Sequence, residues 1–411
     1  MTTTGPLRGF KVLDLSRILA GPYCTMLLGD MGADVLKVES FAGDDTRQWG
    51  PPFVKGESTY FLGVNRNKRS VCIDFKAPGG VQLLHRLAAK CDVVVENFKP
   101  GDADRLGIGF EALRATNRSL IYGAITGFGD RGPDRDRLAY DAFVQAYAGI
   151  VSITGHADGA PTKVGVAVTD VMTGMLMSNA VTAALLQRER SADKLGQRID
   201  TSLFETQLAA LVNVASATLI ADAPSARFGT AHPSIVPYQI FRSAGGSHVA
   251  VGALNDLQHG RLLAALQRAL ADCGVAAQLE QLQAPQFASN AGRVQNRVAY
   301  LELLQSLLLL KSQREWQQVF DDALVPCSAV NTVKEAFQLP QAAALGMLAE
   351  VQHPLIGALR QVGVPVKMSA TAWSIRRPPP LLGEHTDEIL RSELAMSDDE
   401  IAQLRALKTI R

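Results

Sequence analysis

The sequence predicts an α/β fold with a mostly parallel sheet in a large domain and a second, smaller α+β domain. Two observations lead to this fold class. Short apolar runs alternate with amphipathic helical segments through the first half of the chain, which is typical of parallel sheets covered on both faces. Beyond residue 221, a loop rich in Pro, Gly and Ser leads into a hairpin pattern and then into helices. We therefore expect a Rossmann-like sheet in a large domain, residues 1–228 plus 325–411, and a small domain at residues 229–324.

Five strands of the large domain are predicted from short β-branched and apolar runs, which are KVLDL, ADVLKVE, SVCIDF, DVVVENF and LIYGAIT. Helical periodicity follows the first run and ends at Gly32, and GGVQLLHRLAAK predicts a crossover helix between the third and fourth runs. A long helix is expected directly after Asp170, apolar at its start and charged at its end. Another helix is expected from about Leu203 to Ala221.

The small domain is predicted from the loop APSARFGTAHPSIVP and the hairpin pattern YQIFRSAGGSHVAVGAL, which turns at Gly245 and Gly246. Helices follow to about Asp322 with no strand between them. VPCSAV then returns to strand character, so we expect the last part of the chain to rejoin the large domain there. Near the C-terminus, RRPPPLLGEHTDEIL joins a polyproline-type segment to a helix with Thr386 as its expected N-cap.

Composition narrows the class of protein. The formal net charge of +1 gives no reason to expect nucleic acid or a membrane surface as partner. No apolar segment is long enough to cross a bilayer, and MTTTGPLRGF does not resemble a signal or transit peptide. The five cysteines form no CxxC pair and the seven histidines have no metal-binding spacing, so we expect a reducing compartment and no metal. The expected location is the cytoplasm, or the mitochondrial matrix if the source is a eukaryote.

Two polar patterns fall at predicted strand ends. GFGDRG, Gly127–Gly132, satisfies G-x-G-x-x-G, but the polar run PDRDR follows where a dinucleotide fingerprint needs a helix. A glycine-lined turn near a ligand is the preferred interpretation. NRNKRS, Lys76, NFKPG and Arg105 also lie near strand ends, where ligands bind in open parallel sheets. These basic residues indicate either a phosphorylated ligand or simply a solvated rim.

Asp170 is a single carboxylate within the small, apolar stretch KVGVAVTDVMTGM. Burying a lone charge costs free energy unless hydrogen bonds or charges compensate it. The plainest interpretation is an N-cap, because an Asp before a helix accepts hydrogen bonds from first-turn amides. A nucleophile is compatible with this, since a carboxylate is ionised at neutral pH and needs no separate base to attack a carbonyl. The small apolar neighbours Gly165, Val166 and Ala167 would suit a site that has to exclude water.

The sequence resembles the class III CoA-transferases, the family of formyl-CoA transferase, over essentially its whole length. The resemblance is carried by VLDLSRILAGP, MGADVLKVE, NRNKRS, VENFKPG, TGFGDRGP, AVTDVMTGM and PLLGEHTDEIL. Within the family the likeness is greatest to the branch that moves CoA from succinyl-CoA to glutarate, through GDDTRQWGPPFVKGESTYFLGVNRNKRS and FGTAHPSIVPYQIF. The tetraglycine loop of the formyl-CoA branch is missing from the second of these stretches.

The resemblance implies that Asp170 is the catalytic residue. Its carboxylate would attack the donor thioester to give an aspartyl-acyl anhydride, and CoA thiolate would then form an aspartyl-CoA thioester. The implied substrates are an acyl-CoA and a carboxylic acid, with coenzyme A as a substrate and no permanently bound cofactor. An interlocked homodimer is also implied. The implied CoA contacts are Leu19, Ala20, Ser40, Ile73, Lys76, Asn97, Phe98, Arg105, Tyr140 and Asp141.

Some positions depart from the family pattern. Ser40 and Leu138 stand where the formyl-CoA branch has basic residues, so fewer phosphate ion pairs are expected unless Arg47 or Lys99 substitutes. For the distal carboxylate of a dicarboxylic acid, Arg47 and His232 are the hypothesised contacts, because both lie in the stretches most like the glutarate branch.

Two other functions stay open at this point. Alpha-methylacyl-CoA racemases are similar but need a histidine just before the position of Asp141, where this chain has Tyr140, a poor acid/base with an ordinary pKa of about 10. His156 could be offered instead, but it lies in the Gly-rich turn ITGHADGAP. The chain could also be a non-catalytic acyl-CoA binding protein.

Overall fold

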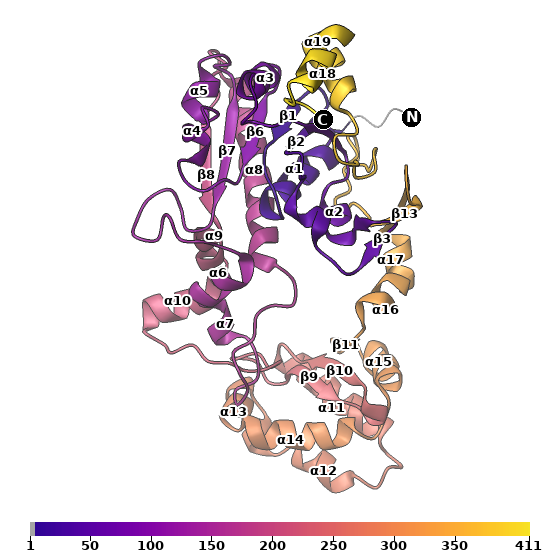
Figure 1. Ribbon diagram of the computed structural model, residues 1–411. Coiled ribbons are helices and arrows are strands. Elements are labelled where there is room, and N and C mark those ends of the chain that lie inside the picture. Colours follow the sequence, from indigo (N-terminus) through magenta and orange to yellow (C-terminus); the bar gives the residue numbers. More distant parts are fainter. Residues whose placement is uncertain (1–4) are drawn as a thin grey trace. The chain divides into compact units, whose positions relative to one another are not determined.

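The computed structural model describes residues 5–411, which form two compact units (Figure 1). The first unit comprises the chain up to Ile150, then Lys163–Ala223 and Leu339–Arg411. The second comprises Val151–Thr162 and Pro224–Gln338. The predicted small domain, residues 229–324, falls inside the second unit, and the chain returns to the first unit at Leu339.

A six-stranded sheet forms the centre of the first unit. Its strands are β1 (Lys11–Asp14), β2 (Asp34–Glu39), β5 (Lys68–Cys72), β6 (Val93–Glu96), β7 (Ile121–Thr126) and β8 (Arg198–Ser202). They lie in the order β5-β2-β1-β6-β7-β8, and every neighbouring pair is parallel. When the six strands are numbered by their sequence order, this is the order 3-2-1-4-5-6 of doubly wound folds. The order in which the strands are added to the sheet reverses between β1 and β6. The predicted α/β class and five of the strands are confirmed.

The two faces of this sheet carry separate cores. Alternate residues point to opposite faces, so Val12, Val35 and Val93 pack with one core while Leu13 and Leu36 pack with the other. Helices α1 (Ala20–Asp30) and α8 (Val168–Arg190) cover the first face, and α3 (Gly80–Ala88), α5 (Phe110–Arg114) and α18 (Thr386–Leu394) cover the second. Each fully buried aliphatic side chain contributes about 1.5–3 kcal/mol to the stability of the fold. Because the central strands are buried on both faces, their sequences are continuous apolar runs.

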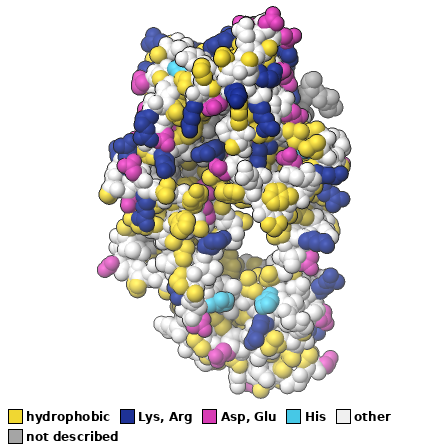
Figure 2. Space-filling model, in the orientation of Figure 1, with side chains coloured by type: hydrophobic (Ala, Val, Ile, Leu, Met, Phe, Trp, Pro, Cys, Tyr) yellow, Lys and Arg dark blue, Asp and Glu magenta, His cyan; other side chains and the backbone are white. Residues whose placement is uncertain are grey.

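The remaining elements of this unit connect or flank the sheet. They are η1 (Asp45–Gln48), β3 (Phe53–Val54), β4 (Glu57–Ser58), α2 (Thr59–Val64), α4 (Asp102–Arg105), α6 (Asp141–Tyr147), α7 (Ile150–Ile153, at the unit boundary), α9 (Leu203–Ala209), α10 (Val212–Ala221), α17 (Pro340–Ala344), β12 (Leu348–His353), β13 (Gly357–Val362) and α19 (Asp398–Ala406). Figure 2 shows Lys and Arg side chains interspersed with Asp and Glu over the visible face, in line with the small net charge.

Two predicted helix boundaries in this unit are wrong. The helix expected from Leu203 to Ala221 is two helices, α9 and α10, which meet at an angle of 74°. The break falls where Val212 has a φ of 39°, without any Gly or Pro to signal it. Thr386 is the first residue of α18 and its N-cap is His385, because the Thr386 hydroxyl donates to the carbonyl of Gly383 instead. Within residues 5–411, no single helix has the length and apolarity for a membrane span, although α9 and α10 would meet that criterion as a bent pair.

The second unit combines a three-stranded antiparallel sheet with helices around a core that includes Phe241, Trp316 and Phe320. Its elements are β9 (Tyr238–Arg242), η2 (Ala244–Gly246), β10 (His248–Gly252), α11 (Asp256–Ala269), α12 (Ala276–Gln281), η3 (Pro285–Phe287), α13 (Asn290–Gln295), α14 (Arg297–Leu308), α15 (Gln313–Asp322), β11 (Cys327–Ala329) and α16 (Val333–Gln338). The predicted hairpin and helices are confirmed. The prediction that VPCSAV rejoins the large domain is wrong, because β11 pairs antiparallel with β10 in this unit.

Candidate active site

A pocket opens at the carboxyl ends of the parallel strands, where the sheet order reverses. The loop after β1 contributes Ile18–Ala20 to it, and the loop after β6 contributes Asn97–Pro100. Strands β1 and β6 are the neighbours between which the order reverses, and ligands bind at this point in open α/β sheets. The loop after β7, the first turn of α8 and Leu203 complete the lining. All of these segments belong to the first unit.

The two loops on either side of the reversal point are joined by hydrogen bonds. The Asn97 side chain accepts from the Arg17 amide at 2.8 Å and donates to the Arg17 carbonyl at 2.7 Å. Glu96 also holds the loop after β6, since its carboxyl accepts a hydrogen bond from the Phe98 amide at 2.6 Å. Ile18 has a φ of 72°, an uncommon conformation for a β-branched residue, and its amide donates to Asp44 at 3.2 Å. The pocket wall is thus held by several side chains rather than left as a free loop.

A buried ionic cluster supports the loop after β1. Asp14 is fully buried and accepts from the Thr25 hydroxyl at 2.7 Å and from Lys68 at 3.0 Å. Burial opposes ionisation of Asp14, but the ammonium groups of Lys68 and Lys37 outweigh it and lower its pKa to about 2. Lys37 in turn donates to the carbonyl of Ser16 at 3.0 Å. These charges are paired and hydrogen-bonded, which is the condition for tolerating them in a core.

This cluster corrects the prediction for NRNKRS, Asn65–Ser70. The prediction left a phosphate site or a solvated rim open, and neither applies, because every residue of the segment is buried. Arg66 pairs with Asp30 at 2.7 Å, and Lys68 pairs with Asp14. The basic residues of NRNKRS are therefore structural ion pairs and are not available to a ligand.

Asp170 lines the pocket from the first turn of α8. The helix begins at Val168 with Ala167 as its N-cap, so Asp170 is the third helical residue and the prediction of an N-cap is wrong. The capping carboxylate comes from Asp141 at the start of α6. It accepts from the amide of Thr169 at 2.9 Å and from the amide of Asp170 at 3.3 Å.

Gln145 holds the capping carboxylate in place. Its side-chain amide donates to Asp141 at 2.6 Å, and its carbonyl oxygen accepts from the Val164 amide at 2.9 Å. Asp141 is therefore both a fixed cap for α8 and a negative charge beside Asp170. The sequence could not reveal this pairing, because 29 positions separate the two aspartates.

The Asp170 carboxyl is strongly perturbed. Its half-buried position, and then the neighbouring charge of Asp141, raise its pKa to about 7. Tyr60 on α2 shares this environment, since burial followed by the charges of Asp170 and Asp141 raises its pKa to about 12. The Tyr60 ring meets that of Trp49 edge to face at 5.2 Å. Neither aromatic residue was predicted for the site.

The predicted neighbours of Asp170 do not seal it from water within this single chain. Val166 is 64% exposed, and Gly165 is exposed as well. The expectation that they exclude water is therefore not met by the chain alone.

The other predicted CoA contacts divide into two groups. The predicted contacts Leu19, Ala20, Asn97, Phe98 and Tyr140 line the pocket with Asp170. Ser40, Ile73, Lys76, Arg105 and Asp141 do not line it. Lys76 and Ser40 are exposed, and Arg105 is an exposed side chain that pairs with Asp102. Ile73 is 1% exposed and packs in the core, so its side chain has no free surface for a ligand.

Neither hypothesised carboxylate contact is among the residues that line the pocket. The Arg47 guanidinium donates to Glu39 at 2.7 and 2.8 Å and lies 3.6 Å over the ring of Phe61. It is not free to bind a substrate carboxylate, which corrects the prediction. His232 belongs to the second unit, where its ring stacks on Tyr238 at 5.5 Å.

Comparison with known proteins decides the family. The family model described as CoA-transferase family III matches residues 7–386. The chain belongs to CoA-transferase family III.

Similar CoA-transferases span nearly the whole chain. Succinyl-CoA:glutarate CoA-transferase of Homo sapiens is 40% identical over 98% of this chain and 90% of its own length. Succinate--glutarate CoA-transferase of Agrobacterium fabrum is 40% identical over 94% of this chain and 95% of its own length. The crystal structure of a CAIB/BAIF family protein from Brucella suis matches with a TM-score of 0.84 and 38% identity, covering 95% of this chain and all of that one. This chain is therefore a transferase enzyme that acts on CoA thioesters.

Proposed function

We propose that this CoA-transferase moves CoA from succinyl-CoA to a dicarboxylic acid such as glutarate, with Asp170 as the nucleophile. One observation carries the proposal. Asp170 lies at the amino end of a 23-residue helix, inside the pocket at the reversal point of the sheet. The identity of about 40% to two glutarate-using relatives supports the choice of substrates.

The proposed reaction balances without water or an external acid. The Asp170 carboxylate attacks the thioester carbon, the carbon–sulfur bond breaks, and an aspartyl-succinyl anhydride and CoA thiolate result. The thiolate attacks the Asp170 carbonyl, which releases succinate and leaves an aspartyl-CoA thioester. The acceptor carboxylate attacks that thioester, the carbon–sulfur bond breaks, and a new mixed anhydride and CoA thiolate result. The thiolate then attacks the acceptor's acyl carbon, which gives the product thioester and restores the carboxylate.

The local geometry supports this role for Asp170. The dipole of α8 favours negative charge at its amino end, both on the carboxylate and on an oxyanion that forms beside it. The capping carboxylate of Asp141 occupies the amides of Thr169 and Asp170 and keeps the helix end in place. Its charge also raises the pKa of Asp170. A carboxylate with a raised pKa is a stronger nucleophile once ionised than an ordinary aspartate, because basicity and nucleophilicity rise together.

We further propose that the enzyme works as the homodimer that its family resemblance implies. Helix α10 supports this, because Val212, Leu219 and Ile220 are 67%, 84% and 85% exposed. Exposed apolar side chains grouped on one helix are typical of a surface that a partner covers. A partner would also be a source of the water exclusion that Val166 does not provide in the single chain.

A transfer assay tests the proposed function. The purified enzyme is incubated with succinyl-CoA and, in turn, glutarate, malate, itaconate and citramalate, and new CoA thioesters are identified by mass spectrometry. We expect glutaryl-CoA from the native enzyme and none from Asp170→Ala. Failure of every acceptor would contradict the proposal and favour an acyl-CoA binding protein. Epimerisation of a 2-methylacyl-CoA without any transfer would favour the racemase alternative.

A further inference from the structure

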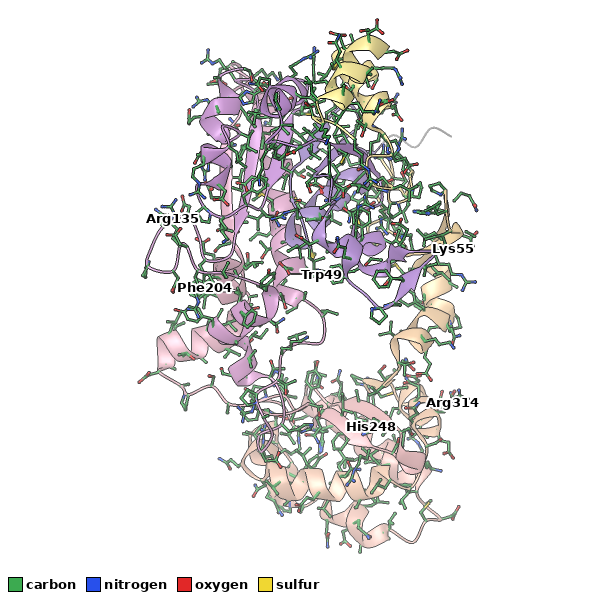
Figure 3. The ribbon with its side chains drawn as sticks, viewed as in Figure 1. Trp49, Lys55, Arg135, Phe204, His248 and Arg314 are labelled. Atoms are coloured by element: carbon green, nitrogen blue, oxygen red, sulfur yellow. The ribbon has the colours of Figure 1, made fainter. Side chains whose placement is uncertain are left out.

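The pocket that holds Asp170 is rich in positive charge. Its lining includes Lys99, Arg135 and Arg137, whereas Asp170 is the one carboxylate that lines it among residues 5–411. A pocket with three cations and one acid suits a ligand that carries several negative charges. Two of these cations, Arg135 and Arg137, come from the loop between β7 and α6, where Figure 3 labels Arg135.

The three cations differ in what they already bind. The Arg137 guanidinium pairs with Asp134 at 3.6 Å and lies 4.2 Å over the ring of Tyr147. Arg135 donates only through its backbone amide, to the Gly132 carbonyl at 3.4 Å, and its guanidinium has no ion pair within residues 5–411. The Lys99 ammonium likewise has no acidic partner in the described part of the chain. Arg135 and Lys99 are therefore the cations that remain for a ligand.

Arg135 lies at the border of the pocket formed by the loop after β6. A Cβ placed on Gly101 would lie 3.5 Å from its Nη2 atom, so the guanidinium lies beside the turn into α4. Arg135 and Lys99 also line an adjoining polar cavity, which Asp170 does not line. The other charged residues of that cavity are Arg198 and the acids Glu96, Asp104 and Asp130. Arg135 thus lies where the two cavities meet.

We propose that Arg135, assisted by Lys99, binds the phosphate groups of coenzyme A. This inference rests on the proposed function, which places the thioester at Asp170. The pantetheine arm separates the thioester from the diphosphate, so the phosphates belong at another part of the pocket than the reacting carboxylate. A guanidinium without a protein partner presents a planar fork of donors that matches phosphate geometry. The charge on phosphate also accounts for a lining that carries more cations than one acyl carboxylate needs.

Methionine variants at two arginines of the same loop test the inference. Arg135→Met removes the proposed contact, and Arg131→Met is the matched control, because the Arg131 side chain is 93% exposed and does not line the pocket. We expect Arg135→Met to weaken binding of free CoA and to raise the KM for succinyl-CoA by about 10- to 100-fold. Arg131→Met should leave the affinity for free CoA and the KM for succinyl-CoA near the native values. The KM for glutarate and the kcat with saturating succinyl-CoA change little in either variant.

Truncated ligands locate the contact on the CoA molecule. Succinyl-pantetheine carries no phosphate, so Arg135→Met should leave its KM unchanged. Dephospho-CoA lacks only the 3′-phosphate, and comparison of its affinity with that of CoA shows which phosphate Arg135 binds. A second variant checks the role of charge itself. Leu138 also lines the pocket and is 67% exposed, so Arg135→Met combined with Leu138→Lys should recover part of the lost affinity.

The outcomes separate this inference from the proposed function. An equal loss with succinyl-pantetheine, a rise in KM for glutarate alone, or no change in CoA affinity would each overturn the inference. Titration of free CoA by calorimetry needs no turnover. It therefore tests the role of Arg135 even if no acceptor yields a product, which is the result that would contradict the proposed function.

Discussion

At the scale of single residues, the site is built on two aspartates held side by side. Asp141 caps α8 and keeps its carboxylate next to Asp170, whose pKa rises to about 7. Burial, and then the like charge of Asp141, destabilise the ionised form of Asp170, and the protein tolerates this at a position that lines its pocket. Perturbed carboxyls of this kind are concentrated at functional sites.

The first prediction concerns the pH dependence of turnover. Because the attacking carboxylate must be ionised, kcat/KM should rise about tenfold per pH unit up to about pH 6 and level off above about pH 8. An aspartate with an ordinary pKa would be fully ionised across this range and give a flat profile. Asp141→Asn removes the neighbouring charge, so the rising part of the kcat/KM profile should move to lower pH. Stopped assays between pH 5 and 9 measure both enzymes, and identical profiles would contradict the coupling.

The second prediction concerns stability. The folded pKa of Asp170, about 7, lies above the ordinary value of 3.8, so the folded state keeps a proton that the unfolded state releases between these values. Stability present at low pH is thus lost as pH rises from about 4 to 7. Asp170→Asn should therefore gain stability over the native enzyme, on the order of a few kcal/mol above pH 7 and nothing below pH 4. Denaturant titrations at pH 4 and 8 measure the difference, and equal gains at both would refute it.

Sequence reasoning identified Asp170 but not its surroundings. Its small apolar flanks and position before a helix singled it out, whereas the true cap comes from Asp141, 29 positions away. Arg47 shows the opposite error. Its place in a stretch most like the glutarate branch suggested a substrate contact, but Glu39, buried at the end of β2, forms an ion pair with its guanidinium. Local sequence cannot distinguish a free cation from a paired one, because the partner is set by the sheet topology.

At the scale of elements, the site depends on the contact of α8 with α1. Gly174 makes that contact possible, since a Cβ there would lie 2.5 Å from the Ala20 carbonyl oxygen. Ala20 also lines the pocket, so the glycine sets how closely the helix that carries Asp170 approaches the loop after β1.

The third prediction follows from this contact. Gly174→Ala should destabilise the first unit by about 1–3 kcal/mol, because the methyl group overlaps backbone atoms that cannot move freely. Gly63→Ala is the matched control. Gly63 lies in helix α2 with no atom within 4 Å of an added Cβ, so alanine there should be neutral or should stabilise by about 0.5–1 kcal/mol. Melting curves of both variants provide the comparison, and a stable Gly174→Ala variant would show that the helices can separate.

Element prediction worked where one face or both faces of a strand are buried. The runs around Val12, Val35 and Val94 are apolar because both faces of the central strands are covered. Strand β8, RIDTS, escaped prediction because it is an edge strand with mostly polar, partly exposed residues. VPCSAV was recognised as a strand but assigned to the wrong unit, because alternation indicates a strand and not its partner.

At the scale of the whole molecule, the order of six parallel strands accounts for the position of the pocket. The reversal between β1 and β6 turns their following loops apart, and the pocket forms between them. Alternating strands and helices predicted this architecture correctly. The division into units was harder to predict, because residues 151–162 join the second unit from the middle of the first.

The fourth prediction concerns assembly. If a second copy covers the apolar side chains of α10, light scattering should give the mass of a dimer, about twice 44.1 kDa. Ile220→Glu places a charge in that surface and should shift the population toward monomer and lower activity in parallel. Lys55→Glu, at an exposed position of another segment, is the control. A native monomer with full activity would contradict the proposed dimer.

In the proposed reaction, one carboxylate at the start of α8 carries the substrate covalently during transfer. Trapping of the enzyme during incubation with succinyl-CoA, using borohydride or hydroxylamine, followed by peptide mass spectrometry, tests this step. We predict that the peptide containing Asp170 is modified, as the reduced alcohol or the hydroxamate, and that no modification occurs without an acyl-CoA. Active enzyme whose Asp170 peptide is never marked, or modification at another carboxylate, would contradict the account.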